Sequence, residues 1–290
     1  MNIIICNVIG ETACSESKKD NGSLSKKKLK EINERRLHAL DALLEESAHK
    51  RADLVVLPGG YFGHNDASEP KNIIIWKDIW KIVKKRNIAV CFGIDTEEKH
   101  QEDVDLNNLF AFAWNAEEGR LPKPAGAWFQ RSMRSTCAAE AKAKDDKSFI
   151  KKSQKVRKFH VGKWTIYPLM CGELFNRHIE KAIVEDKSKN KIVVDLVHTA
   201  GTTKTEDNKK GLGRFRANKA LERWSYHKNI KAIVISRHAK TKHVTSRETD
   251  KVRYKCGLEH GIDGKFCNNP KERFIVNNHG IIIEAGCVKI

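Results

Sequence analysis

The sequence predicts one α/β domain built on a mixed β-sheet, and three observations support this fold class. Short apolar runs bounded by turn residues alternate with segments of helical periodicity, as in chains where strands and helices take turns. Two hairpins, at residues 108–121 and 272–286, add antiparallel pairs to the parallel strands that such alternation predicts. No linker-like stretch or repeat interrupts the 290 residues, so we expect a single domain over residues 1–290.

The first half of the chain predicts three buried strands and two amphipathic helices. Each strand is a short continuous apolar run, and each helix places apolar residues three and four positions apart. The expected elements, in chain order, are strand 2–10, loop 11–28, helix 29–51, strand 52–58, helix 73–87 and strand 88–94. The hairpin at residues 108–121 follows them.

The second half continues the alternation and closes with the terminal hairpin, whose turn is "NNHG". Before that hairpin, the expected elements are strand 163–175, helix 176–186, strand 191–201, helix 215–229 and strand 230–238. The basic segment 122–158 has few periodic apolar residues and predicts a long loop. Residues 239–272 are polar and give no clear signal.

Charge gives only weak support for nucleic-acid binding. The formal net charge is +18, which suits acidic partners. However, the lysines are spread along the whole chain, and no aromatic residues are interleaved with them as stacking platforms for bases. A basic composition alone predicts solubility and non-specific binding rather than a defined interface.

Hydropathy and cysteine usage predict a cytoplasmic protein without a membrane span. No run of about 18 apolar residues occurs, which is the length a spanning helix needs. The apolar N-terminus lacks the basic region of a signal peptide and fits a first buried strand better. The eight cysteines are scattered, several of them within apolar runs, which is typical of buried reduced thiols.

The stretch "PLMCGELFN" contains a candidate nucleophile, Cys171. This cysteine follows an apolar strand and precedes Gly172 and a helix, so its thiol can be exposed at the end of the strand. The backbone N–H of Gly172 can then face an oxyanion, because helix N-termini favour negative charge. In a chain with eight cysteines, the alternative is one more buried thiol.

The stretch "DLVVLPGGYFG" is a buried strand that ends in glycine. Chemistry in α/β proteins gathers at the ends of such strands. Position 59, immediately after Pro58, nevertheless carries no side chain.

Taken in order, five segments resemble the nitrilase superfamily of carbon–nitrogen hydrolases over nearly the whole chain. They are "ADLVVLPGGYF", "FAFAWNAEEGRLPKPAGAWFQRSM", "HVGKWTIYPLMCGELFN", "RFRANKALERWSYHKNIKAIVISRH" and "FIVNNHGIIIEAG". The resemblance implies a four-layer α-β-β-α sandwich with mixed sheets, a small-molecule amide or nitrile substrate, and a homodimer or larger homo-oligomer. It also implies a Glu–Lys–Cys triad that works through a thioester or thioimidate, with no cofactor.

The sequence departs from that triad at two of its three positions. The resemblance places the nucleophile at Cys171, the base glutamate at Gly59 and the lysine at Arg131. A glycine cannot accept a proton. An arginine can donate hydrogen bonds to an oxyanion, but it stays charged and is bulkier than lysine.

One explanation is that another side chain handles the proton. The resemblance suggests Glu140 as the family's second glutamate, and Glu173 lies two residues after the nucleophile. The alternative for Glu173 is a carboxylate that orders the turn or pairs with a cation. His64, Asp66 and Glu69 follow the strand at 52–58, but solvated loop residues are the favoured reading for His64 and Glu69.

The other explanation is a catalytically degenerate protein that binds a small anionic ligand or a protein partner. Arg131, Arg134 and the basic segment after them suit an anion. No metal site is predicted, because Cys256, His260 and Cys267 lack the spacing of a standard zinc site and an evident fourth ligand.

Overall fold

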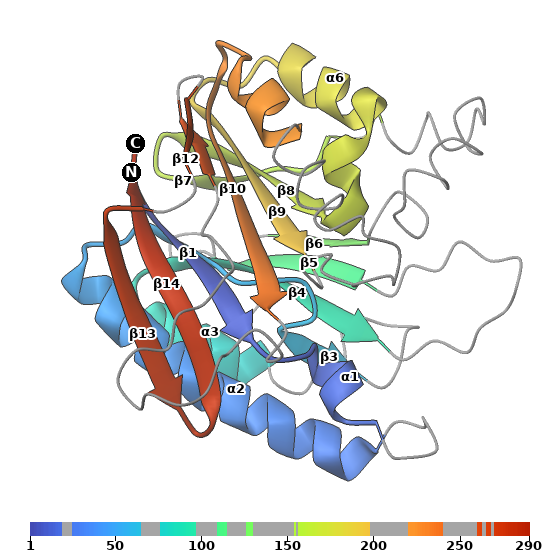
Figure 1. Ribbon diagram of the computed structural model, residues 1–290, viewed down its shortest axis with the longest axis vertical. Helices are drawn as coiled ribbons and strands as arrows, with labels where there is room; N and C mark the ends of the chain where they lie inside the picture. The colour runs from blue at the N-terminus through green and yellow to red at the C-terminus, as the bar shows by residue number, and fades with distance from the viewer. Residues whose placement is uncertain are drawn as a thin grey trace, which may run out of the picture.

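A curled β-sheet runs through the centre of the molecule, with helices against its two outer faces (Figure 1). The computed structural model describes residues 1–18, 25–64, 76–96, 109–114, 126–129, 154, 156–197, 220–239, 260–262, 265–267 and 270–290. Within these residues, parallel and antiparallel strand pairs occur in the same sheet, which confirms the predicted mixed α/β fold.

Six strands form the parallel part of the sheet. In spatial order they are β4 (Ala89–Thr96), β2 (Leu54–Val56), β1 (Asn2–Ile9), β10 (Ile230–Ala239), β9 (Lys191–Val197) and β8 (Trp164–Met170). Strand β2 pairs with β1 only over residues 3–5, and β10 pairs with β1 over residues 7–9. Strand β1 therefore joins two halves of the sheet. One half contains β2 and β4, and the other contains β10, β9 and β8.

Antiparallel strands extend this core at several places. Strand β5 (Leu109–Trp114) pairs with β4, and β6 (Gly126–Phe129) pairs with β5. Strand β7 (Phe159–Val161) forms a hairpin with β8. The closing hairpin of β13 (Glu272–Asn278) and β14 (Ile281–Lys289) pairs with β1. The shorter strands are β3 (Phe62–His64) beside β4, and β11 (His260–Ile262) with β12 (Lys265–Cys267) beside β10.

Three apolar clusters show that the molecule has four layers. The first lies between the sheet and helices α2 (Lys26–His49) and α3 (Trp76–Arg86), and it includes Ile4, Val55, Val90, Leu43 and Val83. The second lies between the two halves of the sheet and includes Ile3, Leu54, Cys91, Met170 and Val194. The third lies between the sheet and the second helical layer, and it includes Val193, Ile233, Ile179 of α6 (Arg177–Glu185) and Trp224. Successive side chains of a strand point to opposite faces of the sheet, so neighbouring residues belong to different clusters. The order of layers is α-β-β-α.

Hydrogen bonds join the two ends of the described chain. The Met1 ammonium donates to the Ile290 carbonyl oxygen at 2.8 Å, and the Ile290 N–H donates to the Met1 carbonyl oxygen at 2.9 Å. The hairpin turn between β13 and β14 uses His279 and Gly280, both with positive φ (49° and 74°). Two successive positive φ values suit a two-residue hairpin turn, so "NNHG" forms the turn that the sequence predicts.

The structure differs from the predicted elements at several places, and one of them is the short helix α1 (Ala13–Glu16) within the loop predicted at residues 11–28. Helix α2 begins at Lys26 rather than at residue 29, because the Ser25 side chain accepts a hydrogen bond from the Lys28 N–H and caps the helix. The strand that pairs with β5 is β6, which lies beyond residue 121 in the segment predicted as a loop. Residues 171–175 form a 3₁₀-helix, η2 (Cys171–Phe175), instead of extending the strand before them.

Replacing Leu43 by Ala tests the first helical layer. Leu43 is fully buried between α2 and the sheet, so truncation removes apolar contact and leaves a cavity. We expect the free energy of unfolding, measured by urea denaturation, to fall by about 2–5 kcal/mol. The control is Lys30→Ala on the exposed face of the same helix, with an expected change below about 1 kcal/mol. Equal losses in both variants would contradict this packing.

Candidate active site

The carboxyl ends of all six parallel strands meet at one edge of the sandwich (Figure 1). Gly59 follows β2 at this edge, and Cys171 follows β8. Strand β6 runs parallel to β4, because each pairs antiparallel with β5. Its last residue, Phe129, therefore also lies at this edge, two residues before Arg131 along the chain. The topology thus directs Gly59, Cys171 and the end of β6 to the same edge.

The turn that carries Cys171 is fixed by a buried ion pair. Both oxygens of the Glu173 carboxylate accept hydrogen bonds from the Arg157 guanidinium, at 3.1 and 2.7 Å. The Glu173 side chain is fully buried, and that of Arg157 is 5% exposed. Glu173 Oε2 also accepts the backbone N–H of Met170 at 3.2 Å. The carboxylate therefore holds the backbone on both sides of Cys171.

The second helical layer holds the same turn from the other side. The Leu174 carbonyl oxygen accepts hydrogen bonds from Trp224 Nε1 at 2.9 Å and from Arg223 Nη2 at 3.2 Å. Helix α6 begins directly after η2, because the Asn176 side chain caps it by accepting from the N–H groups of His178 and Ile179. The backbone of Cys171 and Gly172 thus lies between a strand, an ion pair and a capped helix. The sequence predicted the strand before Cys171 and the helix that begins after Asn176, but not the 3₁₀-helix between them.

The contacts of Glu173 match the structural alternative that the sequence left open. The carboxylate both orders the turn and pairs with a cation. Its role in proton transfer stays a prediction. Its partner Arg157 was missed, since it lies 16 residues earlier in the basic segment predicted as a long loop.

The turn after β2 is fixed in a similar way by Arg36 of α2. The side chain of Arg36 is buried, and its Nη1 donates to the carbonyl oxygens of Gly60 (3.0 Å) and Tyr61 (2.6 Å). Its Nη2 donates to the Glu11 carbonyl oxygen and to Glu16 Oε2. Burial lowers the pKa of Arg36, and the charge of Glu16 acts in the opposite direction. Gly59 therefore belongs to a turn that a buried cation holds by its backbone.

A carboxylate that the sequence analysis did not single out lies against this turn. Asp95 of β4 is 7% exposed, and its Oδ2 lies 2.4 Å from where a Cβ on Gly60 would stand. Gly60 has φ +70°, a conformation that side chains rarely adopt. No local sequence signal identifies Asp95, because its proximity to Gly60 depends on the pairing of β2 with β4.

The remaining sequence candidates are only partly placed. Arg131, Arg134, Glu140, Asp66, Glu69 and Cys256 lie outside the described residues. His64 is half-buried in β3, and His260 stands opposite Cys267 in the β11–β12 pair. Within the described part of the chain, no group of three or more His, Cys, Asp or Glu side chains is arranged to hold a metal ion.

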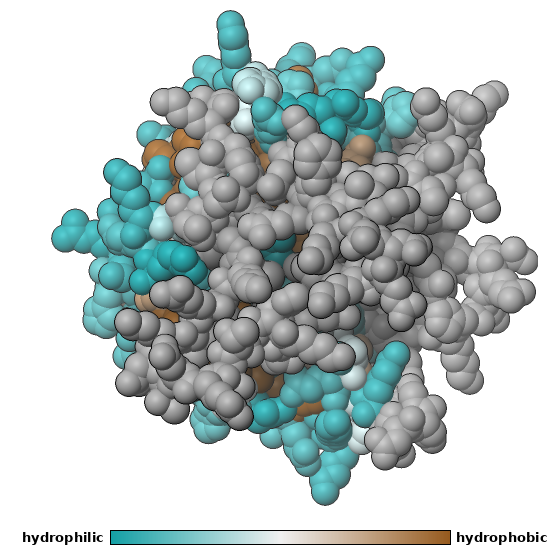
Figure 2. All heavy atoms as spheres, in the orientation of Figure 1, coloured by the Kyte–Doolittle hydropathy of each residue, from teal (hydrophilic) through white to brown (hydrophobic). Residues whose placement is uncertain are grey.

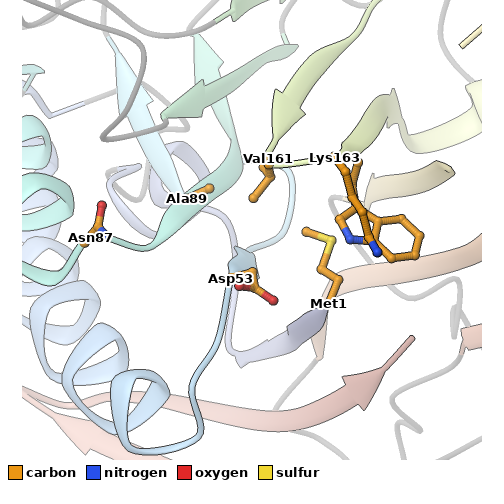
Figure 3. Close-up of a pocket in the computed structure, with 8 residues that line it drawn as sticks. Met1, Asp53, Asn87, Ala89, Val161 and Lys163 are labelled. Atoms are coloured by element: carbon orange, nitrogen blue, oxygen red, sulfur yellow. The ribbon is translucent and has the colours of Figure 1, made fainter. Parts of the chain in front are cut away.

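A separate cavity of about 380 Å³ lies at the opposite edge of the sandwich (Figure 3). Met1, Asp53 and Ala89 line it where β1, β2 and β4 begin, and Lys163 and Trp164 line it at the start of β8. Because these are the amino ends of the parallel strands, the cavity is separate from the edge that carries Cys171.

One face of the described part of the molecule has a largely polar surface (Figure 2). On the face that Figure 2 shows, the coloured side chains are mainly hydrophilic, with small hydrophobic areas between them. In the described ranges, no helix is both long and apolar enough to cross a membrane.

Breaking the ion pair from one side tests its role in fixing the nucleophile turn. Arg157→Met leaves the Glu173 carboxylate buried without its cation, so we expect the free energy of unfolding to fall by about 3–5 kcal/mol. The double variant Arg157→Met/Glu173→Met should recover much of that loss. The neighbouring Lys158→Met, which removes a partly exposed pair with Asp186, serves as the control, with about 1 kcal/mol or less. Equal losses for Arg157→Met and Lys158→Met in urea denaturation would contradict this role.

Comparisons with known proteins relate this fold to amidases. No protein-family model and no curated protein matches the sequence. Among solved structures, a mutant amidase from Nesterenkonia sp. AN1, whose active-site cysteine has added to acrylamide, aligns with a TM-score of 0.56 at 11% identity, over 98% of this chain and 92% of that chain.

Two further structures of that amidase agree. A mutant in complex with butyramide gives a TM-score of 0.57 at 11% identity, over 99% of this chain and 90% of that chain. Another, described as a mutant amidase from the nitrilase superfamily, gives 0.55 at 11% identity, over 98% and 90% of the two chains. At this identity, the likeness shows the shared architecture over nearly the whole chain. The chain has the α-β-β-α fold of the nitrilase superfamily, which the order of its sequence motifs predicted.

Proposed function

We propose that this chain is a carbon–nitrogen hydrolase-like protein in which Cys171 attacks the carbon of a small, non-peptide amide or nitrile. The position of Cys171 carries the proposal. It follows a parallel strand at the carboxyl edge of the sheet, in a turn held by the buried Glu173–Arg157 pair. Rigid placement of this kind is what covalent catalysis needs. The amidase structures with the same fold, which use an active-site cysteine, support the assignment.

The chemistry would proceed in two steps. The Cys171 sulfur forms a bond to the amide carbon, the C–N bond breaks, and the thiol proton leaves with the amine, which gives a thioester. Water then attacks the thioester, releases the acid and returns the proton to the thiol. The Gly172 N–H and Arg131 would hold the developing oxyanion, and Glu140 or Glu173 would handle the proton. No cofactor takes part in this scheme.

In this proposal, the protein acts in the cytoplasm as a homodimer or larger homo-oligomer.

A second candidate function follows from Gly59. The turn after β2 is held by Arg36 through backbone carbonyls, and it presents no side chain at the position that the resemblance gives to the base. A protein that has lost its base would keep the fold and bind a small anionic ligand or a protein partner instead. Arg131 and Arg134 would favour an anion.

The rate of Cys171 alkylation as a function of pH separates the two functions. We expect the rate, followed by peptide mass spectrometry with iodoacetamide, to rise with an apparent pKa well below 8, because an activated site stabilises the thiolate. Cys6 and Cys91 are internal controls: burial raises the pKa of both thiols, so they should stay unmodified in the folded protein. Cys171→Ala checks the peptide assignment.

A Cys171 thiol that titrates near its ordinary value of about 8.5 would contradict the hydrolase and favour the binding protein. The next measurement would then be thermal stabilisation by small carboxylates and phosphates. A low apparent pKa instead justifies a screen of small amides and nitriles for release of amine or ammonia, with Cys171→Ala as the inactive control.

A further inference from the structure

Glu180 of α6 is a buried carboxylate with three basic neighbours. Its side chain is 5% exposed. Arg223 Nε lies 2.7 Å from Oε2 and 3.0 Å from Oε1, Arg177 Nη1 donates to Oε2 at 3.2 Å, and His227 Nε2 lies 2.9 Å from Oε1. Burial by itself raises the pKa of Glu180, but the hydrogen bonds from Arg223 and His227 lower it below its ordinary value. The carboxylate is therefore ionised at neutral pH.

Arg223 connects this carboxylate to the turn that carries Cys171. While its Nε faces Glu180, its Nη2 donates to the Leu174 carbonyl oxygen at 3.2 Å. Leu174 belongs to η2 and lies three residues after Cys171. One guanidinium, whose donors point in fixed directions, therefore contacts the α6 carboxylate and the nucleophile turn at the same time.

The Leu174 carbonyl oxygen has a second donor, Trp224 Nε1, at 2.9 Å. The Trp224 side chain is fully buried in the apolar cluster between the sheet and the second helical layer, so packing fixes its direction. The side chain of Arg223 is 26% exposed and has many rotamers in the absence of a partner. Its direction therefore depends on the Glu180 carboxylate.

The nucleophile turn is thus held from two sides by two carboxylate–arginine pairs. The Glu173–Arg157 pair holds the strand side of η2, and the Glu180–Arg223 pair holds its helix side. The backbone of Cys171 lies between the two. A backbone N–H stabilises a thiolate or an oxyanion only from a fixed position, so the loss of either pair weakens that stabilisation.

We propose that Glu180 is a positioning residue for the Cys171 nucleophile. It orients Arg223, which in turn fixes η2 through the Leu174 carbonyl oxygen. This inference rests on the proposed hydrolase function. Glu180 takes no part in bond formation or proton transfer, and it acts through the backbone of the turn alone.

Glu180→Gln tests the proposal by the pH profile of Cys171 alkylation. The amide keeps the shape of the side chain but loses the charge that holds Arg223. We expect the rate at pH 7 to fall about fivefold, as for the loss of one net hydrogen bond, and the apparent pKa to rise. Glu180→Asp keeps the charge and should restore part of the rate. The matched control is Glu185→Gln, which neutralises an exposed carboxylate on the same helix and should leave the profile unchanged.

A double variant shows whether Glu180 acts through Arg223. Arg223→Met should slow Cys171 alkylation by a similar factor, and adding Glu180→Gln to it should slow the reaction no further. Losses that multiply in the double variant would mean that the two residues act independently, and they would overturn the inference.

Arg223→Lys covers the case in which Glu180→Gln does not fold. The ammonium can still pair with Glu180, but it lacks the second nitrogen that reaches Leu174. We expect slow alkylation of Cys171 together with a thermal unfolding temperature close to that of the wild type. A folded Arg223→Lys protein with the wild-type alkylation profile contradicts the inference.

Failure of this inference is distinguishable from failure of the proposed function. If wild-type Cys171 is activated and Glu180→Gln loses stability but keeps the wild-type alkylation profile, Glu180 does not position the nucleophile, but the hydrolase proposal stands. If wild-type Cys171 already titrates near the ordinary thiol value, both proposals are overturned.

Discussion

The buried Glu173–Arg157 pair is the constraint on which the candidate site depends. Arg157 stands just before β7 and Glu173 just after β8, so the pair joins the two outer ends of one hairpin. Desolvating two charges costs much of what their attraction returns, so the pair is not by itself a large source of stability. Its effect is geometric. A bidentate guanidinium–carboxylate contact permits one arrangement, and the Cys171 backbone lies inside that arrangement.

On the other half of the sheet, a buried arginine also holds a turn in place. Arg36 reaches from α2 into the turn after β2 and donates to two of its carbonyl oxygens, while Glu16 pairs with the same guanidinium. Each of the two turns that resemble catalytic segments is therefore held by a buried arginine from outside the turn. Such support fixes the turns before a ligand arrives, which both a reactive site and a specific binding site require.

The comparison with the Nesterenkonia amidase separates architecture from chemistry. About 11% identity is enough to keep four layers over nearly the whole chain, because a strand needs only alternating apolar residues and a helix only a periodic apolar face. Function belongs to individual side chains on such a frame. Here the four-layer architecture is kept, but position 59, to which the resemblance assigns a proton acceptor, is a glycine.

The sequence alone predicted the longer strands, the approximate limits of most helices, the order of motifs, the position of Cys171 after a strand and the glycine at position 59, because these are local signals. It did not identify Arg157 as the partner of Glu173, β6 as the partner of β5, or Asp95 as the neighbour of Gly60. Each of these is a contact between residues far apart in the chain. Such contacts depend on strand order and register, which burial across the entire sheet decides and no short stretch of sequence encodes.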